Sequence, residues 1–594
     1  MKSSLSSIVR LSVILVIIVS LASVRAAVWS GAANTTSGSG TDWNTAGNWN
    51  PSGVPGVGVD ADCQMSDADY TINYNTPMSA DSFGKLLISN DADHTTTLNI
   101  DAGGFKSYHT EPSTVTSAGG KIVVGNDGDA GFYGMYSPST GNADLTVAGD
   151  FVVDGGNAVI YAGRYTLVDD GGSITVKGGN LLLNTYQTSP ARVTDAVVNL
   201  QGGALTFNRG VRLGYYGAGD GVLNITGGTL TLSGATIGMG NDSGLIDMSG
   251  GTVTNDSVLI LGYDNYSSGN KGVLNLSGGT WTQDGGEQVT LARFRGTEGN
   301  ALNITGTGLF TTTGDMRIGD ETDRGVGSGT LNVNGGSYIA TNEDGDATVD
   351  LYRGTVRVQN GTLTTDRLTA TNGTYSVIDF DGGTMTINDS TDVDNGSTLQ
   401  VGDGTKEALL VLNGSTHSFA NGLSVSNNAA LQGTGTITTP AGTTSTSVAS
   451  GGTLIPGNSI GTLNVTHDLS IAGGAGYDYE ISSLSVHDLV AVGGELTLPG
   501  TGETVTLNLS LVEPKRTLSA ADVELFTYGT LAGYTGVDWT INLIGDYWLG
   551  TPSVYDDESG TIYLSGITFI PEPASIALLG LGLLALMRRK RRRG

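Results

Sequence analysis

Cysteine is nearly absent from this chain, since Cys63 is the only one among 594 residues. A single thiol cannot close an intramolecular disulfide, so a disulfide framework is excluded. Cys63 also lies far from the N-terminal region in which a lipidated cysteine would follow a leader peptide. We therefore expect strand pairing and apolar packing to hold the fold together.

Aromatic residues and charges are also sparse, at 7% and 14% of the chain. Strong helix formers such as Lys, Glu and Gln are few, which argues against long helices. By contrast, Gly contributes 93 residues, and Thr, Ser, Asn and Val are abundant. This composition favours many short strands joined by tight turns.

Basic residues are scarce, and nine of them lie in the first 26 and last 21 residues. Without those nine, the formal net charge deepens from −29 to −38. A body with this charge repels nucleic acid and anionic membranes, so we expect neither as a partner of the body. Neutral polymers and cations are easier partners, and solubility in the outside medium accounts for the acidity.

Sequence motifs for catalysis and cofactor binding are missing too. The five His residues form no HxxxH or HxH pair, and the chain has no GxSxG or P-loop. Asp169 and Asp170 are adjacent and would face opposite ways on a strand, so they favour a turn over a catalytic pair. The acidic loop at 320–324 lacks the spaced Asp ligands of a calcium loop. We expect no cofactor, no metal and no enzymatic activity, with a polysaccharide lyase or glycosidase on a β-helix as the alternative.

The N-terminus has the three parts of a secretory leader peptide over residues 1–26. Lys2 and Arg10 precede an apolar run at 11–21, and small residues then precede a cleavage predicted between Ala26 and Ala27. A membrane anchor is the alternative, but the apolar run is short for one. The leader predicts export.

The C-terminus carries a second targeting signal. Pro571, Glu572 and Pro573 precede an apolar stretch from Ala574 to Met587, followed by a basic cluster of Arg588, Arg589, Lys590, Arg591, Arg592 and Arg593. As a helix the stretch would reach about 21 Å, against a hydrocarbon core of roughly 30 Å. The basic cluster favours a cytoplasmic end for the chain, and a plain tail anchor is the alternative.

These three parts in order resemble the PEP-CTERM sorting tail. The resemblance implies recognition by an exosortase-like transpeptidase in a Gram-negative-type bacterium, of a kind that often makes exopolysaccharide. It also implies that the chain contacts the inner membrane transiently, through the tail alone, before processing. We expect the cell envelope, outer surface or extracellular matrix as its final location.

Between the two ends, one phrase recurs, as in LNITGG (223–228), LNLSGG (274–279) and LNVNGG (331–336). From position 174 onward the copies start 22 to 29 residues apart, the length of one solenoid coil. Within one copy, Leu223 and Ile225 alternate with polar residues, and a Gly pair follows as a corner. Two further short strands complete each copy. The predicted fold class is all-β, a right-handed parallel β-helix (β-solenoid).

A polar position within the phrase is repeatedly asparagine. We expect these residues to stack along the rod: Asn99, Asn199, Asn224, Asn275, Asn303 and Asn332. A ladder that stabilises the solenoid is the favoured interpretation, and a hydrogen-bonding array for a polymer is the alternative.

The segment before the repeats concentrates Trp29, Trp43 and Trp49 in 21 residues. Large aromatic side chains can cover the open first coil of a solenoid, so we expect an N-terminal cap, with sugar binding as the alternative. The pattern, with GNWNPSGVPGVGVDAD (47–62), resembles the N-terminal edge of autotransporter-like adhesins.

A further resemblance covers residues 431–498. The segments LQGTGTI (431–437) and GGTLIPGNSIGTLNV (451–465) look like the C-terminal part of an autotransporter passenger. That family implies a right-handed β-helix displayed on the cell surface. About 70 residues separate this part from the sorting tail, so we do not expect transport through a barrel of its own.

Variable loops after the third strand of each copy carry aromatic residues: Tyr215, Tyr216, Tyr263, Tyr266 and Phe294. In a solenoid, equivalent loops emerge on one edge, so these residues are predicted ligand loops for sugar stacking or protein contact. The alternative is that these aromatic residues bind nothing.

The sequence thus divides into a leader peptide (1–26), a cap region (27–96), solenoid repeats (97–400), a passenger-like continuation (401–500), a C-terminal β-rich region (501–570) and a sorting tail (571–594). The predicted function is a structural or adhesive protein of the cell surface or matrix, with exopolysaccharide or neighbouring cells as partners.

Overall fold

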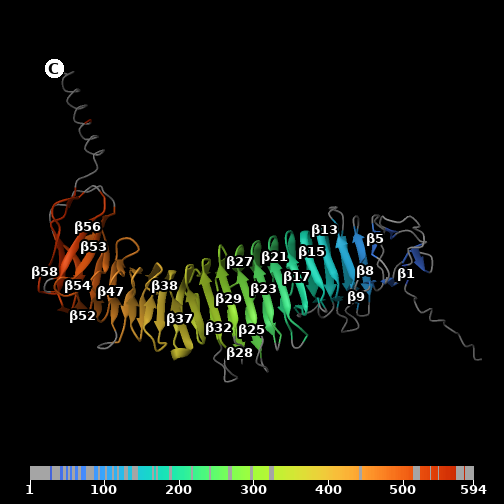
Figure 1. The fold of residues 1–594 in the computed structure, drawn as a ribbon, viewed down its shortest axis with the longest axis horizontal. Coiled ribbons are helices and arrows are strands. Elements are labelled where there is room, and N and C mark those ends of the chain that lie inside the picture. The colour runs from blue at the N-terminus through green and yellow to red at the C-terminus, as the bar shows by residue number, and fades with distance from the viewer. Residues whose placement is uncertain are drawn as a thin grey trace, which may run out of the picture.

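The computed structural model describes much of residues 27–569 together with Leu581. The described ranges are 27–29, 41–43, 48–50, 54–55, 60–64, 69–74, 86–90, 94–100, 104–109, 113–116, 119–125, 131–136, 145–162, 166–168, 171–185, 190–215, 218–239, 242–264, 271–294, 299–319, 327–440, 445–512, 522–534, 537–545, 548–569 and 581. Between residues 27 and 569 they form an all-β structure, apart from short 3-10 segments such as η2 (Gly373–Tyr375). Figure 1 shows an elongated, gently bent rod of strands stacked across its long axis.

Three parallel ladders of strands build the rod, as the repeated phrase predicts. The first ladder stacks β2 (Thr41–Asp42), β5 (Tyr70–Tyr74), β7 (Thr96–Ile100), β10 (Gly120–Val124), β13 (Asp150–Ala162), β15 (Ser173–Thr185), β17 (Ala196–Leu200), β20 (Gly221–Ile225), β23 (Gly244–Met248), β26 (Gly272–Leu276), β29 (Asn300–Thr305), β32 (Gly329–Asn334), β35 (Gly354–Val358) and β37 (Ser376–Phe380). A six-stranded sheet follows in the C-terminal part: β39 (Leu399–Val401), β42 (Leu423–Val425), β45 (Thr446–Val448), β48 (Leu469–Ile471), β52 (Glu495–Thr497) and β55 (Thr530–Ala532).

The second ladder begins at β8 (Gly104–His109) and β11 (Gly131–Tyr136) and includes the second halves of β13 and β15. It continues through β18 (Ala204–Phe207), β21 (Thr229–Leu232), β24 (Thr252–Asn255), β27 (Thr280–Gln283), β30 (Leu309–Thr312), β33 (Ser337–Ala340), β36 (Thr362–Ala370), β38 (Gly383–Val393), β40 (Ala408–Leu412), β43 (Ala429–Gly433), β46 (Thr453–Pro456), β49 (Gly476–Ser483), β53 (Thr504–Leu511) and β56 (Asp538–Leu543).

The third ladder stacks β9 (Ser113–Thr116), β12 (Leu145–Val147), β14 (Thr166–Val168), β16 (Ala191–Val193), β19 (Val211–Leu213), β22 (Ala235–Met239), β25 (Leu259–Asp264), β28 (Val289–Phe294), β31 (Met316–Ile318) and β34 (Thr348–Leu351). It passes through the second halves of β36 and β38 to β41 (Thr416–Phe419), β44 (Thr436–Thr438), β47 (Thr462–Val465), β51 (Leu489–Val492) and β54 (Val523–Thr527). The predicted parallel β-solenoid is therefore confirmed.

The core is one continuous column between the ladders. In β20, Leu223 and Ile225 are fully buried, while Asn224 between them is partly exposed and Thr226 beyond them is exposed. Each coil presents only a few such residues, so its core is completed by the coils above and below. Gly228 turns the next corner with φ +77°, where an added Cβ would lie 2.6 Å from the carbonyl oxygen of Gly203.

The predicted asparagine ladder runs along the outer face of the first ladder. The amide of Asn224 donates to Asn199 Oδ1 at 2.9 Å, and Asn303 donates to Asn275 Oδ1 at 2.9 Å. Asn332 continues the series with a bond of 3.4 Å to Asn303. Asp247 takes the place between Asn224 and Asn275, and its Oδ1 accepts the amide of Asn275 at 2.6 Å. The predicted ladder is therefore confirmed from Asn199 to Asn332. Asn99 lies outside it, because the same position in the three intervening coils holds Val123, Val152 and Thr175.

The N-terminal end is closed by a small sheet of β1 (Ala27–Trp29), β3 (Trp49–Asn50), β4 (Ala61–Gln64) and β6 (Leu86–Ser89). Trp29, Trp43 and Trp49 are at most 2% exposed. Their rings meet edge to face, with centroids 4.9 Å apart for Trp29–Trp49 and 4.6 Å apart for Trp43–Trp49. The three tryptophans therefore form a buried cap whose rings are closed to a sugar ligand.

The C-terminal end changes from parallel to antiparallel pairing. Here β54 pairs with β59 (Thr561–Ser565), and β58 (Ser553–Asp556) pairs with the same strand. Two shorter antiparallel pairs join β49 with β50 (Val486–His487) and β57 (Trp548–Leu549) with β60 (Thr568–Phe569). These antiparallel strands end the parallel stack of coils.

Candidate functional site

The two targeting signals fall almost entirely outside the described residues. This applies to the tail residues Pro571, Glu572 and Pro573, to the stretch from Ala574 to Met587 except Leu581, and to the basic cluster from Arg588 to Arg593. Ala26 lies outside as well, whereas Ala27 begins β1, and its backbone nitrogen donates to the Asp60 carbonyl at 2.8 Å. Among the residues that the structure does describe, no helix is long and apolar enough to cross a membrane.

The predicted ligand loops are partly described. Tyr215 follows β19, and its ring carries Arg192 Cζ at 3.8 Å and Arg212 Cζ at 5.4 Å from the centroid. Tyr263 lies in β25, with Arg293 Cζ 5.7 Å from its ring centroid. A guanidinium over a ring is a cation–π contact, so protein groups already cover one face of Tyr215.

The remaining predicted loop residues, or their side chains, lie outside the described part of the chain. Tyr216 and Tyr266 lie outside the described residues, and so does the side chain of Phe294, although its backbone ends β28. Tyr215 follows β19, and Tyr263 lies near the end of β25, so both lie where the third ladder leads into the first. The sequence did not single out Arg192 and Arg212, which pack on the ring of Tyr215.

An open groove of about 960 Å³ crosses the outer face of the second ladder at β38, β40, β43 and β46. Its floor includes one register row of Thr384, Leu409, Ala430 and Thr453. Two threonines, a leucine and an alanine thus form this part of the groove surface. These residues lie beyond the repeated phrase, so they could be recognised as neighbours only after strand register was known.

The ionisable groups that line the groove are Lys406 and Glu407. The remaining polar rim includes Asn360, whose amide donates to Asn334 Oδ1 at 2.8 Å, and Asn428, whose amide donates to the Gly404 carbonyl at 3.2 Å. One carboxylate beside one ammonium differs from the paired carboxylates with which glycosidases usually work. The groove can hold a ligand by shape and hydrogen bonds.

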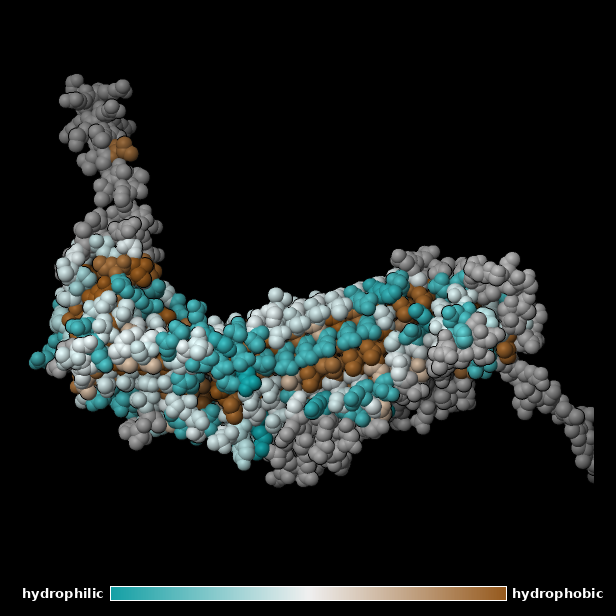
Figure 2. Space-filling view, in the orientation of Figure 1, coloured by the Kyte–Doolittle hydropathy of each residue, from teal (hydrophilic) through white to brown (hydrophobic). Residues whose placement is uncertain are grey.

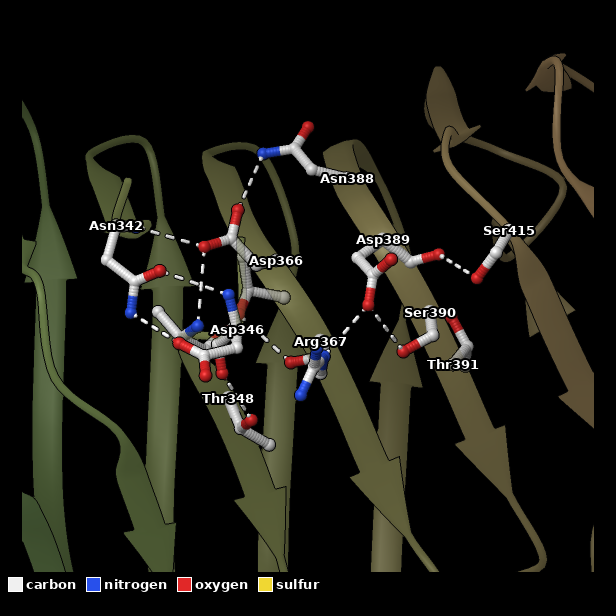
Figure 3. A network of polar contacts seen from close by, with 12 residues as sticks. Asn342, Asp346, Thr348, Asp366, Arg367, Asn388, Asp389, Ser390, Thr391 and Ser415 are labelled. Carbon is white, nitrogen blue, oxygen red and sulfur yellow. Dashed lines mark hydrogen bonds and ion pairs between the residues drawn. The ribbon is translucent and has the colours of Figure 1, made fainter. Parts of the chain in front are cut away.

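A network of polar contacts occupies the corner between the second and third ladders (Figure 3). Asp366 is 3% exposed, and its carboxylate accepts the backbone N–H groups of Asn342 at 3.0 Å and Ala347 at 3.3 Å. It also accepts the amide of Asn388 at 3.3 Å. Asp366 therefore fixes the turn at 342–347 from the next coil, a structural role for a buried acid that the sequence did not single out.

The same corner carries an ion pair between neighbouring coils. Arg367 Nε lies 2.8 Å from Asp389 Oδ2, and Ser390 donates its hydroxyl to that oxygen at 3.2 Å (Figure 3). Both partners of the ion pair are partly exposed, so solvent screens it and we assign it little stability. Its geometry ties two coils together without forming a concave site.

A second buried acid lies near the C-terminal end. Asp488 is fully buried and accepts the backbone N–H groups of Glu480 at 2.7 Å and Gly461 at 2.8 Å. Burial raises the pKa of Asp488 to about 7, against the lowering effect of these two bonds. Its hydrogen bonds to backbone indicate that it holds β47, β49 and β51 together.

Metal-ligating groups do not gather in the part of the chain that the structure describes, since no cluster of three His, Cys, Asp or Glu side chains occurs there. Cys63 is buried in β4, and burial raises the pKa of its thiol well above the ordinary value, with Asp62 adding to the shift. A thiol held in its protonated form is a poor nucleophile and a poor metal ligand.

Comparison with protein-family models identifies the PEP-CTERM protein-sorting motif at residues 569–593. The predicted sorting tail is therefore confirmed. This motif marks proteins that are exported and processed by an exosortase, so the solenoid is exposed outside the cell. A comparison with curated proteins gave no match.

Proposed function

We propose that this protein is a structural or adhesive rod of the cell surface or extracellular matrix of a Gram-negative-type bacterium. The inner membrane holds it transiently by its tail until an exosortase cuts it. Exopolysaccharide or neighbouring cells are its partners. The observation that carries the proposal is the continuity of the ladders, the second of which runs from β8 to β56.

Continuity matters because it makes the rod stiff. Side-chain ladders join coil to coil, as in Asn224–Asn199 and Asn303–Asn275, and every coil shares its apolar core with its neighbours. A stiff rod presents equivalent positions at a repeat of about 4.8 Å, which suits contact with an extended partner. An acidic body of this length also stays soluble outside the cell.

Cells that lack the protein provide the test. We expect deletion to reduce retention of cells in their own matrix, and the full chain to restore it when reintroduced. A chain with Glu572→Ala, which leaves the solenoid unchanged, should fail to restore retention because it is not sorted. Unchanged retention after deletion would overturn the adhesive role.

The alternative function, a polysaccharide lyase or glycosidase, is favoured by one observation, the groove that carries Lys406 and Glu407. The experiment treats mature protein from the cell surface with uronate-containing and neutral polysaccharides and measures reducing ends and unsaturated products. We expect neither product above background. Turnover that disappears with Glu407→Gln but survives in a control variant, Glu503→Gln outside the groove, would establish the enzyme instead.

A further inference from the structure

The outer face of the first ladder carries an aliphatic row across five consecutive coils. Its members occupy one register position in β17, β20, β23, β26 and β29: Val197, Val222, Leu245, Val273 and Ala301. All five are half-buried, so each leaves part of its side chain in solvent. We call this set the aliphatic row.

A polar row runs beside it, two residues further along each strand. This amide row consists of Asn199, Asn224, Asp247, Asn275 and Asn303, in register with one another. Figure 2 shows the two as a hydrophilic band running along the rod with a hydrophobic band beside it, in the region of β17, β23 and β29. Both bands therefore face solvent on the same side of the molecule.

The unbroken row is limited to these five coils, and a single further valine, Val377, takes the same register position one coil beyond Thr355. In the two coils before the row, the same register position holds Asp150 and Ser173, and in the two coils after it, Thr330 and Thr355. Strand formation alone does not require valine or leucine here, because the polar neighbours form the same ladder. Apolar groups kept in water over several adjacent coils indicate a contact surface.

The charges on this face narrow the choice of occupant. Asp247 is the one ionisable residue of the two rows, whereas the chain as a whole has a formal net charge of −29. A second copy of the chain would bring the same excess negative charge and be repelled. A neutral ligand has no such penalty, and the two parallel rows suit one that is linear.

The amide row keeps hydrogen-bonding capacity after forming its ladder. Asn224 uses one amide hydrogen to reach Asn199 Oδ1 at 2.9 Å, and Asn303 uses one to reach Asn275 Oδ1 at 2.9 Å. Each primary amide has two N–H donors and two acceptor lone pairs, so the ladder leaves a donor and an acceptor on such residues. Hydroxyl groups of a sugar can both donate to and accept from these atoms.

We propose that this face binds a neutral linear polysaccharide that lies along the rod. The apolar C–H faces of its sugar rings cover the aliphatic row, and its hydroxyl groups bond to the amide row. This inference rests on the proposed adhesive function and gives it a site and a ligand class.

The test is native gel electrophoresis of the mature surface protein through gels that contain one polysaccharide each. The neutral probes are hydroxyethyl cellulose, galactomannan and dextran, and the anionic probe is alginate. We expect at least one neutral probe to retard the protein and alginate to leave it unaffected. Retardation by no neutral probe, or stronger retardation by alginate, would overturn the proposal.

Two matched variants test whether polysaccharide binding depends on this face or on another part of the rod. The triple variant Val222→Ser, Leu245→Ser and Val273→Ser removes apolar groups from the row, and we expect affinity to fall by about tenfold, equivalent to ~1.4 kcal/mol. The control is Thr330→Ser with Thr355→Ser, at the same register positions beyond the row, and it should bind as the original does. Equal binding by both variants would overturn the site.

Melting of each variant shows whether the fold survives. If the triple variant unfolds early, the single variant Val222→Thr takes its place, since threonine keeps the branched shape and the strand preference. Sedimentation then measures whether the protein is a monomer or a dimer. A dimer that the triple variant abolishes would make this face a self-association surface and overturn the polysaccharide assignment.

The adhesive function and this site can fail separately. If deletion of the protein leaves cell retention unchanged, the proposed function fails, whatever the gels show. If deletion reduces retention but the triple variant restores it fully, the function stands and the site is wrong. In that case a variant of the predicted loop residues, with Tyr215 and Tyr263 changed to Ser, is the next to compare.

Discussion

Individual side chains in this rod have opposite environments at neighbouring positions. Ile225 is fully buried between the ladders, while Thr226, the next residue, is exposed. The strand pleat sets this difference, because successive side chains point to opposite faces. The free energy of unfolding therefore depends strongly on Ile225 and hardly at all on Thr226.

We predict that Ile225→Asp lowers the free energy of unfolding by roughly 3 kcal/mol or more, because it places a carboxylate in an apolar column. Thr226→Asp, which adds the same group on the outside, should change it by about 0.5 kcal/mol or less. Urea denaturation of both variants measures the difference. Similar losses for the two would show that the alternation is assigned to the wrong face.

His417 provides a second prediction at this scale. The side chain is fully buried, its Nε2–H donates to the Asn413 carbonyl at 2.7 Å, and its Nδ1 accepts the Thr391 hydroxyl at 2.9 Å. Burial lowers the pKa of His417 below its ordinary value. The neutral ring is thus the form that fits the fold.

Because the folded pKa lies below the unfolded one, the contribution of His417 is present above about pH 6.5 and is lost as the pH falls below it. We predict that the melting temperature of the original protein falls relative to that of His417→Gln between about pH 7 and about pH 5. Protonation of the buried Asp488 acts in the opposite direction, but it acts equally in both proteins and cancels in this comparison. His467→Gln, on a partly exposed ring, is the control and should leave the slope unchanged. The same slope in both variants would contradict the assignment.

At the scale of elements, the corners between ladders hold neighbouring coils in register. Asp366 in β36 accepts two backbone N–H groups of the turn at 342–347, which belongs to the preceding coil. This carboxylate supplies hydrogen-bond acceptors for backbone N–H groups that have none within the turn itself. Loss of the side chain would leave buried donors without an acceptor.

We predict that Asp366→Ala lowers the free energy of unfolding by about 2 kcal/mol or more, since a stranded buried donor costs about 1–3 kcal/mol. Hydrogen exchange should accelerate first at the backbone amides of Asn342 and Ala347. Asp392→Ala, at an exposed position of β38, is the matched control and should have little effect. Unchanged exchange in the Asp366 variant would mean that the turn does not depend on this acid.

At the scale of the whole molecule, one column of apolar side chains runs from the tryptophan cap to the antiparallel strands β58 and β59. No coil has a core of its own, so damage to one coil weakens its neighbours. The sorting tail at 569–593 delivers this single unit to the cell exterior. Fold and destination are thus encoded in separate segments of the chain.

We predict that the mature surface protein lacks its basic C-terminus, because the apolar stretch from Ala574 to Met587 is short for a lasting anchor. Intact-mass measurement should show that the segment from Arg588 to Arg593 has been removed. Glu572→Ala should leave full-length protein in the inner-membrane fraction, with its melting temperature unchanged. If the mature protein retains the basic cluster, this prediction is wrong and the C-terminal stretch is a plain tail anchor.

The sequence alone determined the fold class, the sorting tail and the inward residues of each strand. Alternation such as Leu223-Asn224-Ile225 fixes which side chains enter the core, and a glycine such as Gly228 fixes a corner, because both effects act within a few residues. The stacked asparagines followed from the same local phrase. The alternation and the corner glycines act within one copy, so they need no knowledge of the neighbouring coil.

Only the tertiary structure decided what the outside of the rod presents. The groove floor at Leu409 and Ala430 and the acceptor role of Asp366 join residues from different coils at positions outside the repeated phrase. Coil lengths vary between 22 and 29 residues, so sequence spacing does not say which outward residues become neighbours. Strand register determines which outward residues are neighbours, because a shift of one residue turns every side chain to the opposite face.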